Sequence, residues 1–189
     1  MVRTDLFRSI SIDEFREHAM TEQTATSAGQ ISVEAFRAAL QQNWKEAFEE
    51  VTGIFLDRGT SMFETLATIS AEEASRPVGG GCSNIAAQVN HVWFYLDIMN
   101  RLGRGEDVPR PVDWDSSWDV GEVDEAEWQR LIDQLRSACE EVSRFIASFD
   151  NWDERMIGGA FGMLAHTAYH LGEIRTGLCT VKGNRDKGA

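Results

Sequence analysis

Apolar residues recur along most of the chain at the three- to four-residue spacing of amphipathic helices. The first such stretch begins after Ser32, a good helix N-cap. It keeps its helical phase from Phe36 to Ile69, which predicts one long helix. Gly53 and Gly59 weaken that helix and allow a break within it, because glycine has poor helix propensity.

Three further amphipathic stretches predict helices over residues 83–103, 124–149 and 159–181. The third helix has the clearest start, because Asp124 can cap it and Glu127, three residues later, can complete a capping box. No strand-like alternation of useful length and no internal repeat occurs in the sequence. The pattern therefore predicts an all-α bundle built from four helices.

Two segments fall outside this helical pattern and one long loop interrupts it. Residues 1–31 form a polar arm with a few apolar positions, and residues 184–189 form a short tail that we expect to be flexible. The loop over residues 103–123 carries Trp114 and Trp118, and loops of that length are often lids or binding loops. The two tryptophans could line a substrate pocket, but we favour the interpretation that they cap one end of the bundle.

Three of the four histidines lie on the predicted apolar faces of two helices. His91 is in the middle of the second helix, and His166 and His170 are four residues apart on the fourth, so their rings share one face. A lone buried histidine is usually a hydrogen-bonded core residue. Three buried imidazoles without partners would each cost about 1–3 kcal/mol in lost hydrogen bonds, and metal ligation removes that cost. Three histidine ligands also leave one coordination position open, as in catalytic zinc sites.

Glu173 lies on the same helical stripe, one turn beyond His170. Its carboxylate could be a fourth metal ligand, a general base or a hydrogen-bond partner of a ligand. It could equally lie at the solvent mouth of the bundle without a role. A fourth protein ligand would make the site closed and structural, which would weaken the case for an enzyme.

Composition and charge exclude several classes of protein. The 189 residues suffice for one core, contain no apolar run long enough to span a membrane, and open on no secretory signal. A net charge of −13 disfavours nucleic acid and anionic membrane surfaces as partners. Cys82, Cys139 and Cys179 are widely spaced, so neither a disulfide framework nor a cysteine-rich zinc site is expected. These features predict a cytoplasmic protein in which any reacting thiol comes from a substrate.

The segment ending at His91, together with the pattern His166-x-x-x-His170-x-Gly172, resembles the DinB/YfiT-like metalloenzyme family. The resemblance covers roughly residues 32–182. It implies an up-down-down-up four-helix bundle over residues 32–183, with His91, His166 and His170 holding one divalent metal ion, usually zinc or nickel. Relatives include transferases and isomerases that use low-molecular-weight thiols, and many are dimers. Glu173 departs from the family, which often has glutamine at that position.

Together these observations predict a metalloenzyme acting on a small-molecule substrate. A metal-bound water would give hydrolysis, and a metal-bound thiol would give thiol transfer or isomerisation. Zinc and nickel are our first choices, although iron and copper also accept imidazole ligands. The alternative is a non-catalytic metal-binding protein that acts in stress response or in interactions. We also expect a homodimer to which the N-terminal arm contributes, because the arm's apolar residues need a host surface.

Overall fold

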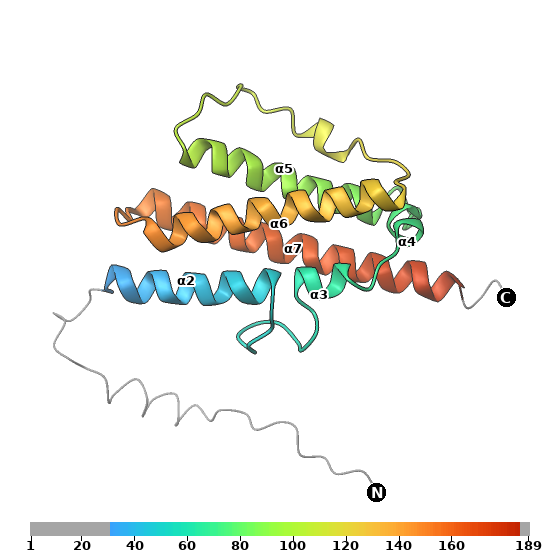
Figure 1. Cartoon of the computed structure of the whole chain (residues 1–189), viewed down its shortest axis with the longest axis horizontal. Coiled ribbons are helices and arrows are strands. Elements are labelled where there is room, and N and C mark those ends of the chain that lie inside the picture. The colour runs from blue at the N-terminus through green and yellow to red at the C-terminus, as the bar shows by residue number, and fades with distance from the viewer. Residues whose placement is uncertain (1–30, 186–189) are drawn as a thin grey trace, which may run out of the picture.

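The computed structural model describes residues 31–185, which form an all-α bundle (Figure 1). Its four long helices are α2 (Val33–Phe48), α5 (Ile85–Gly103), α6 (Glu125–Ser148) and α7 (Glu154–Arg185). Helices α2 and α7 run in one direction and α5 and α6 in the other, which confirms the up-down-down-up order. Short helices α3 (Met62–Leu66), α4 (Ala71–Ser75) and the 3₁₀ helix η1 (Asp115–Trp118) lie in the connections. No strand occurs among the described residues.

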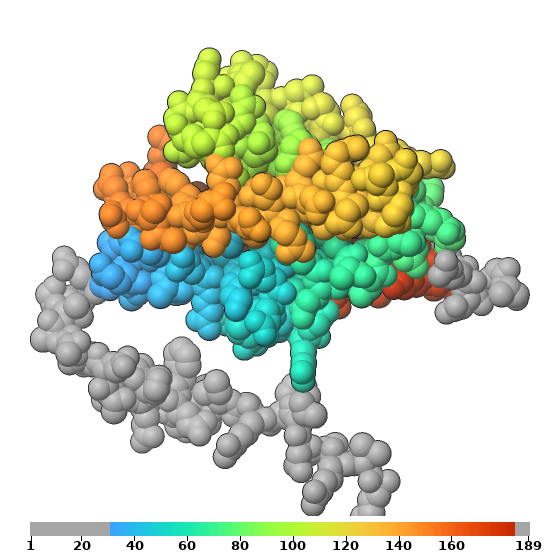
Figure 2. Space-filling model, viewed as in Figure 1, coloured from blue at the N-terminus to red at the C-terminus, as the bar shows by residue number. Residues whose placement is uncertain are grey.

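The core lies along the contacts of α6 with α2 and α5, and Figure 2 shows α6 filling the space between these two helices. Leu96 of α5, Leu135 of α6 and Ile174 of α7 are fully buried there. Each such side chain contributes about 1.5–3 kcal/mol through burial. The Trp44 ring donates from its Nε1 to the Cys139 carbonyl at 3.3 Å, so the buried indole keeps a hydrogen-bond partner.

The single helix predicted from Phe36 to Ile69 is wrong, because α2 ends at Phe48 and α3 begins only at Met62. The intervening loop contains the two glycines that weaken the pattern. Gly53 has φ +89° and Gly59 has φ +75°, a region that disfavours side chains with a Cβ. The helix ends at Phe48, so the break begins shortly before the two glycines that allowed it and includes both of them.

Glu46 organises this loop. Its fully buried carboxylate accepts hydrogen bonds from the backbone N–H groups of Thr52, Ile54, Phe55 and Leu56, at 2.6–2.9 Å, and from the Thr52 hydroxyl at 2.6 Å. Burial by itself raises the pKa of Glu46, but these donors outweigh it and lower the pKa to about 2. The loop is thus wrapped around one ionised side chain.

The predicted start of the third helix is confirmed. Asp124 accepts from the backbone N–H of Glu127 at 2.8 Å, and the Glu127 carboxylate accepts from the backbone N–H of Asp124 at 3.0 Å. The second helix has Asn84 as its N-cap, accepting from the Ala87 N–H at 2.7 Å, and ends at Gly103 as predicted. Local capping chemistry therefore fixes the first residue of each of these two helices.

The fourth helix begins five residues before the predicted Gly159 and continues past the predicted end at Val181. Asp153 causes the earlier start, because its carboxylate accepts from the Met156 N–H at 2.8 Å and its carbonyl from the Ile157 N–H at 2.9 Å. Acidic side chains at this position also suit the positive end of the helix dipole.

Residues 1–30, including most of the predicted arm and His18, lie outside the described residues, as do residues 186–189 of the predicted tail. The arm's role and the homodimer stay predictions. No helix between residues 31 and 185 combines the length and apolarity needed to cross a membrane.

Candidate metal centre

The bundle brings the three predicted histidines together. His91 projects from the middle of α5, and His166 and His170 from successive turns of α7. The Nε2 atom of His166 lies 3.3 Å from that of His91 and 3.2 Å from that of His170, and all three potential ligand atoms lie within 4.8 Å of one another. Two nitrogens that each lie 2.0–2.1 Å from a tetrahedral zinc ion are about 3.3 Å apart. The spacing therefore suits a shared metal ion.

The other nitrogen of His91 is held by the long loop. Its Nδ1 lies 2.6 Å from the Ser117 hydroxyl, which itself donates to the Trp114 carbonyl at 2.6 Å. Since that hydroxyl proton is directed to the carbonyl, Ser117 accepts from the Nδ1–H group of His91. The His91 Nε2 atom then carries the lone pair that a metal needs, and it faces the other two rings.

His170 is held in the same tautomer from the other side. Its Nδ1 lies 2.8 Å from the amide oxygen of Gln88 and 3.0 Å from a carboxylate oxygen of Glu173. Both oxygens accept, so Nδ1 carries the proton and Nε2 the lone pair. Tyr169 donates to the second Glu173 oxygen at 2.7 Å. Glu173 thus contacts the ring nitrogen that points away from the cluster, which is the position of a partner of a ligand.

His166 has a different environment. Its Nδ1 is buried without a hydrogen-bond partner among the described residues, and its ring stacks on Tyr95 with centroids 3.9 Å apart. His91 stacks in the same way on Trp118, also at 3.9 Å. The two stacking contacts fix the planes of the rings. Trp118 therefore lines the site, and our preferred interpretation of it as a cap at the end of the bundle is wrong.

All three rings are in the neutral form that binds metals. Burial, with smaller contributions from neighbouring histidines, lowers the pKa of His91 and of His166 to about 4. Burial also lowers the pKa of His170, although Glu173 opposes that shift. At neutral pH the cluster therefore presents neutral imidazoles, and the lone pairs of His91 and His170 both face His166. A divalent cation fits this donor set, because it would satisfy the facing nitrogens together.

The cluster opens to solvent through a cavity of about 530 Å³. Besides the histidines, its walls include Trp118, Glu173 and Cys82. The sequence predicted no role for the three cysteines, but the glycine turn before α5 brings the exposed Cys82 to the cavity wall. The run of three glycines is the sequence feature that could have indicated a tight turn before Cys82. In the structure Gly79, Gly80 and Gly81 all have positive φ.

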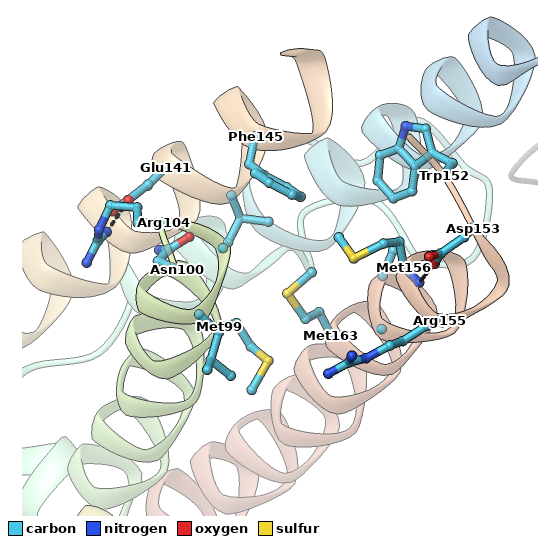
Figure 3. Close-up of a pocket in the computed structure, with 15 residues that line it drawn as sticks. Met99, Asn100, Arg104, Glu141, Phe145, Trp152, Asp153, Arg155, Met156 and Met163 are labelled. Atoms are coloured by element: carbon cyan, nitrogen blue, oxygen red, sulfur yellow. Dashed lines mark hydrogen bonds and ion pairs between the residues drawn. The ribbon is translucent and has the colours of Figure 1, made fainter. Parts of the chain in front are cut away.

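A second cavity, of about 380 Å³, lies where α5 ends and α7 begins (Figure 3). Its lining is mostly apolar, and the side chains of Met99, Met156 and Met163 gather in it with Phe145 and Trp152 nearby. It contains no histidine among its lining residues. This cavity therefore offers no imidazole ligand for a metal ion.

Replacing Ser117 with alanine should weaken metal binding by about tenfold, because His91 would lose the acceptor that fixes its tautomer and orientation. Competition with a chromophoric chelator measures this change. Ser116→Ala is the matched control, since Ser116 is exposed and bonds only within the loop. Equal affinities of the two variants would show that the Ser117 contact does not orient the ligand.

Comparison with known proteins agrees with this geometry. A family model described as the DinB superfamily matches residues 55–174, more than half of the chain, and the match includes all three histidines. Neither the curated proteins nor the solved structures contain a match to the chain. The family match and the all-α bundle together establish that the chain belongs to the DinB superfamily.

Proposed function

We propose that this protein is a metal-dependent enzyme in which His91, His166 and His170 hold one divalent ion, with zinc or nickel as the first choices and iron or copper as alternatives. The observation that carries this proposal is the approach of the His91 and His170 Nε2 atoms to that of His166, at 3.3 and 3.2 Å, with all three ligand atoms within 4.8 Å of one another. The oriented Nδ1 groups of His91 and His170 add support, because ligating histidines usually donate their second N–H to an acceptor.

The donor set favours the activation of a thiol or a water. Three neutral imidazoles leave the full charge of a divalent ion uncompensated, and when bound the ion would lower the pKa of a coordinated thiol or water. The resemblance to thiol-dependent transferases and isomerases makes a low-molecular-weight thiol our first candidate substrate. Hydrolysis by a metal-bound water is the second candidate reaction.

The chain's own cysteines fit the proposal that the reacting thiol comes from outside. Burial raises the pKa of Cys139 to about 12, which makes it unreactive, and Cys179 does not line the histidine cavity. Cys82 lines that cavity but is not part of the histidine cluster. The substrate thiol would therefore approach the open side of the cluster past Cys82 and Trp118.

Glu173 is our tentative catalytic residue. Its carboxylate is hydrogen-bonded to His170 and Tyr169, yet the side chain keeps 36% of its surface exposed at the cavity wall. A carboxylate at that position can accept the proton that a bound thiol or water releases and pass it to solvent. Its contact with His170 gives it a second task, which is to hold that ring in place.

Turnover separates this proposal from a non-catalytic metal-binding role in stress response or interactions. Protein purified without a chelating resin and then loaded with zinc or nickel would be tested with a panel of small thiols and an electrophile. We expect thiol transfer that disappears on metal removal and in His170→Ala. Metal binding without turnover on any thiol or on hydrolysable esters would favour the non-catalytic alternative.

A further inference from the structure

The histidine cavity adjoins another hollow of about 420 Å³ beside α7, which is distinct from the methionine-lined cavity of Figure 3. The two hollows share five lining residues, which include Gln88, Tyr169 and Glu173. Beyond them the second hollow is bounded by Val78, Ile85 and a stretch of α7 that ends at Gly177. The metal centre therefore lies at one end of a continuous groove, and a substrate held at the histidines would extend past Glu173.

Charge is distributed very unevenly along this groove. Among the described residues that line it, Glu173 is the one carboxylate, and no lysine or arginine is present. Its two oxygens are fixed by His170 and Tyr169. Apart from the metal ion itself, a carboxylate or phosphate on the substrate would find no cationic group there, and Glu173 would repel it.

We infer that the groove discriminates among small thiols by charge, and that Glu173 is the residue responsible: it favours thiols that carry an ammonium group over thiols that carry a carboxylate. This inference rests on the proposed binding of a thiol at the histidine centre. The side chain is partly exposed, so the effect of one charge on another is moderate and is reduced by salt. A ligand without a charge should be almost indifferent to Glu173.

The test uses full-length protein loaded with cobalt(II), because a thiolate bound to cobalt gives a charge-transfer absorption band that reports binding without turnover. Cysteamine, 2-mercaptoethanol and mercaptoacetate form a series of similar length with a positive, neutral and negative substituent. Each is titrated into the wild type, Glu173→Gln and the control Glu34→Gln, which removes the same charge from an exposed position in α2. These thiols differ in acidity, so each is compared as the ratio of its Kd in the variant to its Kd in the wild type, in which the acidity cancels.

For Glu173→Gln we expect the Kd of cysteamine to rise by about fivefold, that of 2-mercaptoethanol to change by less than about twofold, and that of mercaptoacetate to fall by about threefold. These differences should shrink in high salt, and Glu34→Gln should leave all three ratios near one. A merely structural role of Glu173 on His170 would change the three Kd values by one common factor, and that result would overturn the inference while leaving the metal–thiol proposal intact. Absence of the band with every thiol in the wild type would instead overturn the proposed thiol function, and the inference with it.

Discussion

His166→Ala should lose tight metal binding, whereas the wild type should hold one divalent ion per chain. The Nε2 atom of His166 lies within 3.3 Å of the Nε2 atoms of both other histidines. Its removal leaves two ligand nitrogens, which is fewer than the three protein ligands of catalytic zinc sites. We expect the affinity for zinc to fall by more than about 100-fold, a larger loss than that of an orienting partner. Elemental analysis of protein purified without a chelating resin, followed by chelator competition, measures both stoichiometry and affinity.

His18→Ala provides the matched control, because it removes the one histidine of the chain that is not among the three proposed ligands. It should bind metal as the wild type does. Circular dichroism of His166→Ala should show the helical content of the wild type, so that the loss is assigned to the ligand and not to unfolding. A folded His166→Ala protein that still carries one tightly bound ion would exclude these three histidines as the site.

Glu46→Gln should lower the free energy of unfolding by about 3 kcal/mol at neutral pH. The pKa of Glu46 falls from 4.5 to about 2 in the folded protein, and a tenfold change in an acid dissociation constant corresponds to about 1.36 kcal/mol. The amide would also direct its own donors at some of the backbone N–H groups that the carboxylate accepts from. Urea unfolding followed by tryptophan fluorescence gives the difference, and Glu49→Gln, the same change at an exposed position, should have almost no effect.

The hydrogen bonds of Glu46 also predict that the free energy of unfolding decreases as the pH falls. Because the folded pKa is lowered, the contribution of Glu46 is fully present above about pH 4.5 and is lost as the pH falls towards 2. The stability difference between the wild type and Glu46→Gln should therefore narrow over that interval. A difference that stays constant between pH 5 and pH 3 would show that the ionisation of Glu46 does not stabilise the loop.

The parts of the structure that the sequence could predict depend on short-range patterns. Helical spacing placed His166 and His170 on one face, and the apolar stripe of α5 placed His91 toward the bundle interior. The capping box at Asp124 located the start of α6 to the residue. These features need only a few neighbouring positions, so a single sequence is sufficient to find them.

The glycines allowed a break after α2, but the end of the helix at Phe48 is hidden in the sequence because its cause is a buried acid. Apolar spacing keeps its phase through the loop, and Glu46 looks like an ordinary exposed helix residue until its carboxylate is seen collecting the loop's N–H groups. The early start of α7 is hidden in the same way, because Asp153 lies in a charged stretch typical of a solvated loop and caps the helix from there. In both cases a polar side chain determines a boundary that the hydrophobic pattern cannot show.

The surroundings of the histidines could not be predicted because they come from distant segments. Ser117 and Trp118 reach His91 from the loop between α5 and α6, and Gln88 reaches His170 from another helix. Contacts across such separations depend on how the helices pack, and packing is not encoded in local spacing. The sequence therefore indicated which residues would meet and offered Glu173 as a partner of a ligand, but not the groups that reach the rings from other segments.

The division of the three histidines between two helices has a consequence for how the protein responds to its surroundings. An ion held by His91 of α5 and by the pair on α7 would join two helices that are distant in the sequence. His91 and His166 are 75 residues apart. Metal that binds only the folded state adds to stability by mass action, about 2.7 kcal/mol when its free concentration is 100 times its Kd. The melting temperature would then vary with the free metal of the medium, and the amount of folded protein in a cell would report metal supply.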